Sequence, residues 1–174
     1  IDSRRAPLTL PSMGGLLSRR VLPALQLTRM ALVFTAISNA QTSMLLWARQ
    51  RQIDMWDVSI LPYLDPRAMI AMAIISIGLY GFGMALNDII DRRRDSELAA
   101  HRPLPSGRIS LAGAQVITGT LAGAAVLAGL YLARQQPFGW LSLAVLVWTA
   151  ALIIFYDYAG KYLVAPGLLA LGLI

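Results

Sequence analysis

Apolar residues in this chain fall in long runs that are separated by short polar segments. The runs lie at residues 27–48, 68–87, 111–133 and 138–158, and each has the ~20 residues that an α-helix needs to cross the hydrocarbon of a membrane. Residues 166–174 begin another apolar run of about half that length. The pattern predicts an all-α integral membrane protein, a helix bundle with about four full transmembrane helices and a truncated fifth.

The composition agrees with a lipid environment. Apolar residues make up 57% of the chain and charged residues 14%, with 15 lysines and arginines against 9 acids. Because the basic residues lie in clusters between apolar runs, we expect anionic headgroups and diphosphates as partners, and no nucleic acid. The absence of cysteine excludes a disulfide framework and a thiolate metal site, and the single histidine cannot form a zinc site alone.

The polar segments connect the helices. Residues 1–26 are basic and contain three prolines, which predicts a short interfacial or irregular lead-in without a signal-peptide pattern. Residues 49–67 form a polar connection. Three aromatic residues in and beside it are placed as an interfacial belt, namely Trp47, Trp56 and Tyr63.

Amides and small residues within the apolar runs indicate helix contacts. Asn39 and Gln41 lie near the middle of the first run, where amides join helices by hydrogen bonds more often than they bind a substrate. Gly119 with Gly123 makes a small face suited to close packing. The second run contains three glycines, Gly78, Gly81 and Gly83. They allow a neighbouring backbone or an isoprenoid chain to approach the helix, and close packing of helices is the commoner explanation.

Carboxylates recur at helical spacing where the second run ends. On a helix of about 3.6 residues per turn, Asp88, Asp91 and Asp95 share one narrow face. Asn87 lies at its edge. Ionisable groups at such a place in a membrane protein are costly and usually functional, and oxygen ligands suit Mg2+, which commonly keeps substrate phosphates in its shell. The stretch therefore predicts a magnesium site that binds a diphosphate.

Arginines lie within and just after the carboxylate cluster and could share the charge of a diphosphate, because guanidinium groups bind phosphate oxygens through paired hydrogen bonds. They are Arg92, Arg93, Arg94, Arg102 and Arg108. The simpler interpretation is a solvated helix end, in which Asp–Arg pairs add a little stability and the basic excess only sets the topology. Since Pro103 and Pro105 interrupt residues 96–110, we expect this segment to fold as a cap over the site.

The order Asn-Asp-x-x-Asp-x-x-x-Asp, followed by Arg-Pro-Leu-Pro-Ser-Gly-Arg, resembles a motif of the UbiA-type superfamily of intramembrane prenyltransferases. Members include quinone, haem O and chlorophyll synthases and EboC-like proteins. The resemblance covers residues 87–110 and implies Mg2+-dependent transfer of a prenyl group from a polyprenyl diphosphate to an acceptor within the membrane. It also implies a set of metal ligands, Asn87, Asp88, Asp91 and Asp95.

A weaker similarity lies at residues 155–161, Phe-Tyr-Asp-Tyr-Ala-Gly-Lys, which resembles the stretch that closes the fourth helix in the family. It implies that Lys161 binds the diphosphate and, with Asp88 and Asp91, belongs to the catalytic residues. The resemblance also implies a set of substrate-binding residues: Asn87, Arg92, Asp95, Arg102, Arg108 and Tyr156.

The superfamily has more membrane helices and a second aspartate-rich motif, which this sequence does not show. Asp157 is a lone carboxylate that nothing equates with that motif. Residues 1–174 are therefore expected to form a single transmembrane domain, the N-terminal part of a longer prenyltransferase fold. The alternative is a non-catalytic accessory or structural subunit that binds lipid, quinone or pigment beside a membrane protein partner.

Basic residues also predict the orientation. The lead-in up to Arg29 holds five arginines, residues 88–110 hold five more, and Lys161 follows the fourth run, whereas four arginines lie between the other ends of the runs. By the positive-inside rule, the N-terminus and the aspartate motif face the cytoplasm. The expected location is the bacterial cytoplasmic membrane.

Overall fold

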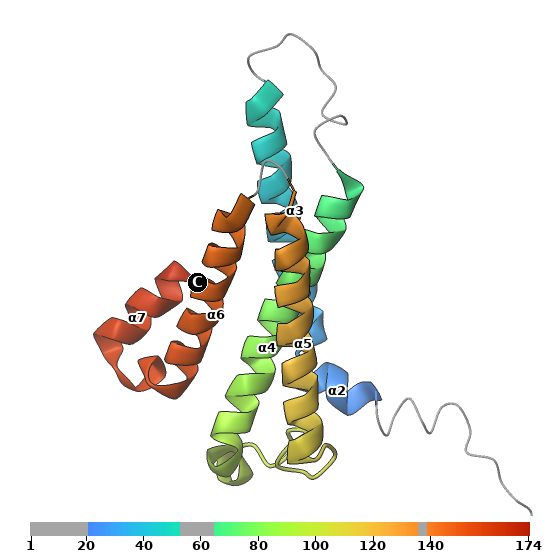
Figure 1. The fold of residues 1–174 in the computed structure, drawn as a ribbon. Helices are drawn as coiled ribbons and strands as arrows, with labels where there is room; N and C mark the ends of the chain where they lie inside the picture. Colours follow the sequence, from blue (N-terminus) through green and yellow to red (C-terminus); the bar gives the residue numbers. More distant parts are fainter. Residues whose placement is uncertain (1–20, 53–64, 136–138) are drawn as a thin grey trace, which may run out of the picture.

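The structure, a computed structural model, describes residues 21–52, 65–135 and 139–174, and their regular structure is entirely helical (Figure 1). The expected all-α fold is therefore confirmed. Successive long helices alternate in direction, so that each lies beside the one before it. The elements are α2 (Leu22–Leu27), α3 (Met30–Gln52), α4 (Pro66–Leu98), α5 (Leu111–Ala133), α6 (Gly139–Tyr158), the 3-10 turn η3 (Gly160–Tyr162) and α7 (Val164–Leu173).

Helices α4 and α5 form the centre of the molecule, with α3 against α4 and α6 against both. Glycines allow their backbones to approach. A Cβ added at Gly78 would lie 2.7 Å from the carbonyl oxygen of Leu121 and 2.8 Å from Cβ of Ala125. One added at Gly81 would lie 2.9 Å from Leu121 Cδ1. Close packing of α4 on α5, the commoner explanation for these glycines, is therefore confirmed.

The expectation of tight packing at Gly119 and Gly123 is wrong for the described part of the chain. Both residues are exposed, and a Cβ added at either would meet no atom within 4 Å. The buried residues of α5 include Ala114, Thr118 and Ala125, which recur at steps of four and seven. Gly119 and Gly123 lie on a different face of the helix from these positions, because each is displaced by one or two residues from that repeat.

Among the described residues, three helices are long and apolar enough to cross a membrane: α4, α5 and α6. The expected count of four spans is not confirmed. Helix α3 has 23 residues, but polar side chains at Asn39 and Gln41 lower its hydropathy. Gln41 Nε2 donates to the carbonyl oxygen of Met69 on α4 at 2.8 Å, so this amide joins two helices. Asn39 is exposed.

Several boundaries differ from the predicted ones. Residues 22–27 form helix α2, whose Leu27 is fully buried in a cluster with Ala85 and Ala114. Of the expected interfacial or irregular lead-in, the irregular form is therefore wrong for this part, and residues 1–20 lie outside the described residues. Helix α4 continues to Leu98, well past the apolar run, because the residues after Asn87 still satisfy the helical hydrogen-bond pattern. Two residues of the expected interfacial belt, Trp56 and Tyr63, lie outside the described residues.

Candidate functional site

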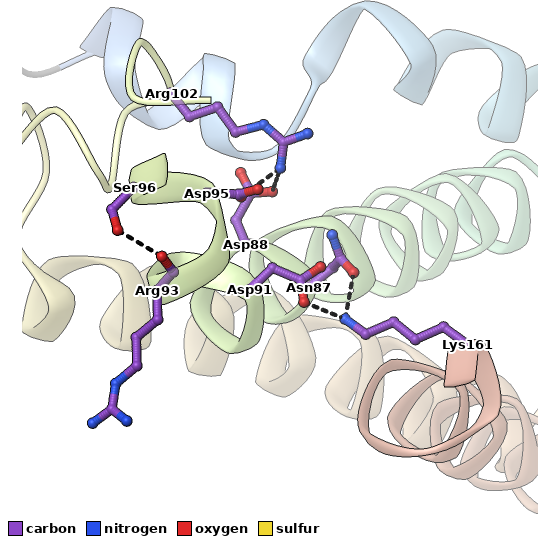
Figure 2. Close-up of polar contacts among 8 residues, drawn as sticks. All are labelled: Asn87, Asp88, Asp91, Arg93, Asp95, Ser96, Arg102 and Lys161. Carbon is purple, nitrogen blue, oxygen red and sulfur yellow. Dashed lines mark hydrogen bonds and ion pairs between the residues drawn. The ribbon is translucent and has the colours of Figure 1, made fainter. Parts of the chain in front are cut away.

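The predicted face of oxygen ligands lies on the last three turns of α4 (Figure 2). Asp88 is 5% exposed and Asp95 is 7% exposed, so both carboxylates are buried at the end of the helix bundle. Asn87 and Asp91 are partly buried beside them. Buried carboxylates need partners, since an isolated charge away from water is costly. The partners come from two other parts of the chain.

Arg102 binds the first pair of carboxylates. Its Nη1 donates to Asp95 Oδ2 at 2.5 Å and lies 3.6 Å from Asp88 Oδ1 (Figure 2). The loop after α4 carries it there in a series of turns, which are closed by hydrogen bonds such as Ile109 N to Pro103 O at 3.2 Å. The expected cap over the site therefore exists, and its contact with the aspartates is made by Arg102.

Lys161 binds the other two residues of this face, Asp91 and Asn87. It lies in η3, and its Nζ donates to Asp91 Oδ1 at 2.6 Å and to Asn87 Oδ1 at 3.3 Å (Figure 2). The side chains of Lys161 and Asp91 are 12% and 13% exposed, so the ion pair is largely shielded from solvent. The structure thus brings together two motifs that lie 70 residues apart in the sequence.

Other predicted site residues lie away from the aspartates. Arg92 is exposed, and Figure 2 shows the neighbouring Arg93 pointing away from the carboxylates. Arg108 is also exposed and donates to Gln26 Oε1 at 2.8 Å, to Ser106 Oγ at 3.0 Å and to the carbonyl oxygen of His101. Its described contacts therefore anchor the loop on α2.

Helix α6 brings two further side chains, Tyr156 and Asp157, toward this end of the bundle. Tyr156 is partly buried, and a Cβ added at Gly160 would lie 3.4 Å from its ring. Asp157 is 4% exposed, and sequence reasoning did not include it among the site residues. Its place in the segment 155–161 that resembles the family, four residues before Lys161, is the signal that could have identified it.

The residues present fit a divalent cation by their chemistry. Among the described residues, Arg102 and Lys161 form ion pairs with Asp88, Asp91 and Asp95, and the charge of Arg29 also acts on Asp88. The four carboxylates, with Asp157, still outnumber these three cationic side chains. Asp88 Oδ1 is buried and has no hydrogen-bond partner among the described residues. No group of three or more His, Cys, Asp or Glu side chains in the described segments is already gathered as a metal site, and three of the four carboxylates are paired with Arg102 or Lys161.

Comparison with known proteins gives one match. Residues 58–173, two thirds of the chain, match the profile of the UbiA prenyltransferase family. The chain belongs to this family. The matched range includes α4, the loop with Arg102, α5, α6 and Lys161, so every polar contact to the aspartates described above lies within the UbiA region. No curated protein and no solved structure matches the chain.

Proposed function

We propose that this protein catalyses the Mg2+-dependent transfer of a prenyl group from a polyprenyl diphosphate to an acceptor within the membrane. Membership of the UbiA family suggests prenyltransferase activity in general. The observation that supports the specific proposal is the meeting of an oxygen-ligand face with two cationic side chains at one end of an apolar bundle. Such a site can bind a metal and a diphosphate together.

In this proposal, Asn87, Asp88, Asp91 and Asp95 hold the cation, which supplies positive charge beside the departing diphosphate. Lys161 and Arg102 bind the phosphate oxygens through charge-assisted hydrogen bonds. The allylic C–O bond breaks, the acceptor forms a bond to the allylic carbon, and the acceptor loses a proton. Aromatic faces that would stabilise the developing cation include Tyr156.

The prenyl chain needs an apolar surface that excludes water. Between α4, α5 and α6 lies an apolar groove of about 430 Å³, with Leu79, Leu132 and Leu146 in its wall. We assign the prenyl chain to this groove because its wall includes Leu79 on α4, which lies about 12 Å along the helix before Asn87.

Metal-dependent binding of an unreactive prenyl thiodiphosphate, followed by calorimetry, tests the proposal. We expect Asp88→Asn/Asp91→Asn to abolish binding, because both carboxylates are required to hold the cation against the diphosphate. Glu97→Gln is the matched control, since Glu97 is an exposed acid near the end of the same helix. Unchanged binding by the double variant would contradict the proposal and favour a non-catalytic accessory subunit.

A further inference from the structure

Asp157 has an environment that the proposed chemistry leaves unexplained. It is 4% exposed, and its Oδ2 has no hydrogen-bond partner within residues 21–52, 65–135 and 139–174. A buried carboxylate oxygen without a donor is unfavourable, and such groups are rare in folded proteins. The charges that act on this carboxylate are those of Lys161 and Asp91.

Lys161 in turn occupies oxygens that a cation would need. Its ammonium group lies 2.6 Å from Asp91 Oδ1 and 3.3 Å from Asn87 Oδ1, which are two of the four proposed metal ligands. A divalent cation on these oxygens would repel the ammonium group, and the two charges cannot share one shielded position. Lys161 must therefore leave Asp91 when a cation binds, and it needs another anion nearby.

We propose that Asp157 is that second partner, and that Lys161 moves between Asp91 and Asp157 as a divalent cation binds to and leaves the aspartate face of α4. The inference rests on the cation site of the proposed function. Asp157 lies at the end of α6 and Lys161 follows in η3, so the exchange moves one charge at the end of a flexible side chain.

The exchange accounts for the unpartnered oxygen. Without a cation, Lys161 neutralises Asp91 and leaves Asp157 unpaired. With a cation, and before the diphosphate binds, Asp91 is neutralised by the metal and Asp157 by Lys161, so the charges are more completely paired; the diphosphate then takes the place of Asp157 as the partner of Lys161. Asp157 therefore acts as a positioning residue that favours cation binding, although it does not touch the cation.

Direct binding of the cation by Asp157 is less well supported. Asp157 belongs to α6, whereas the proposed metal ligands all lie on the last turns of α4, and the charge that acts most on Asp157 is that of Lys161. Asp157 is thus placed to receive the lysine, and a double-mutant cycle can separate the two roles.

The experiment measures Mn2+ binding to the full-length chain in lipid nanodiscs, by electron paramagnetic resonance and without any diphosphate. Asp157→Asn should weaken Mn2+ binding about tenfold, as expected for strongly coupled neighbours. Lys161→Gln should tighten it, because the competing charge is gone. In the Lys161→Gln background, Asp157→Asn should have little effect. If Asp157→Asn weakened Mn2+ binding equally in the unmodified protein and in the Lys161→Gln variant, the proposed exchange would be overturned. If the unmodified protein did not bind Mn2+ at all, the proposed cation site would be overturned instead.

A second measurement follows the lysine itself. Lys161 is the only lysine in the 174 residues, so its acetylation can be read from one peptide by mass spectrometry. Saturating Mn2+ should raise the acetylation rate several-fold more in Asp157→Asn than in the unmodified protein, since the released lysine then has no second carboxylate. Asp157→Glu keeps the charge and should behave like the unmodified protein. Equal rates in all three with Mn2+ bound would contradict the proposal.

Discussion

Two cationic side chains, Arg102 and Lys161, divide the acidic face of α4 between them. They differ in how many carboxylates each one neutralises. Arg102 bridges two buried carboxylates from a loop that turns tightly around Pro103, whereas Lys161 pairs with one carboxylate, Asp91, through a flexible stem. At the residue scale, we therefore expect Arg102 to contribute mainly to stability and Lys161 mainly to ligand binding.

Replacement of Arg102 tests this division. Arg102→Met removes the ion pairs of Asp88 and Asp95 and should lower the free energy of unfolding by about 1–3 kcal/mol, the range for leaving buried polar groups unpaired. Arg102→Lys should lose less, because one charge remains. Arg93→Met is the control, since Arg93 is exposed and points away from the carboxylates, and its effect should stay within about 0.5 kcal/mol. Denaturation in detergent micelles gives these values, and an equal loss from both Met variants would contradict the assignment.

At the scale of single elements, α4 organises the molecule because it is longer than a membrane crossing requires. It begins at Pro66, where the Asp65 side chain accepts a hydrogen bond from Arg67 N at 2.9 Å, and it continues for 33 residues. About 20 residues suffice to span the hydrocarbon, so the remaining turns carry the carboxylates toward the membrane surface. In the proposed function, the carboxylates would meet the diphosphate there.

Gly78 on α4 should tolerate no larger residue. Gly78→Ala places a methyl group 2.7 Å from the Leu121 carbonyl oxygen, which is backbone and cannot move aside, so we expect a loss of about 1–3 kcal/mol in unfolding free energy. Gly123→Ala on α5 is the matched control, because its Cβ meets open space. That change should be neutral or stabilise the protein by up to about 1 kcal/mol through helix propensity. Thermal unfolding of both variants in the same detergent measures the difference. Similar unfolding midpoints would show that α4 and α5 are less closely packed at Gly78 than the structure indicates.

The sequence alone predicts the elements well where chemistry marks their ends. Helix α5 spans the predicted residues 111–133, because Ser110 caps it through a hydrogen bond from Gly113 N at 3.0 Å. The apolar pattern places the end of α4 at Asn87, eleven residues too early. Hydropathy marks where the chain leaves the hydrocarbon of the membrane, and a polar helix can continue beyond that point into water. The prediction of close packing at Gly123 is wrong, because a small residue allows another helix to approach but does not require it to do so.

For the candidate site too, the sequence predicts what depends on local structure and misses what depends on tertiary contacts. Helical spacing places Asp88 and Asp91 on one face, and the structure shows this face. The partners of the carboxylates depend on tertiary contacts, and hydropathy cannot give the direction in which a loop broken by proline turns. Arg92, Arg102 and Arg108 therefore looked equivalent in the sequence, yet only Arg102 contacts the described aspartates. Lys161 was suggested by resemblance to a family, and not by spacing.

At the scale of the whole molecule, the charged side chains gather at one end. Helix α2, the loop after α4 and η3 all lie at the lower end of the bundle in Figure 1. Arg108 joins the loop to α2 through Gln26, and Lys161 joins η3 to the end of α4 through Asp91. The opposite end carries the start of α4 and the end of α5, with Arg67 and Arg134. The basic asymmetry along the sequence is therefore also an asymmetry in space.

This asymmetry predicts the topology, with the aspartate site at the cytoplasmic face. The chain contains no cysteine, so single cysteines can be introduced without a background. Ser106 in the loop after α4 and Gln135 after α5 are both exposed and lie at opposite ends. In sealed inside-out vesicles, an impermeant maleimide should label Ser106→Cys and leave Gln135→Cys unlabelled, and right-side-out vesicles should give the reverse. Val126→Cys, on an exposed apolar position of α5, should react in neither, because lipid covers it. Labelling of both surface positions from one side would show that α5 does not cross the membrane, and a reversed pattern would place the diphosphate site on the outer face.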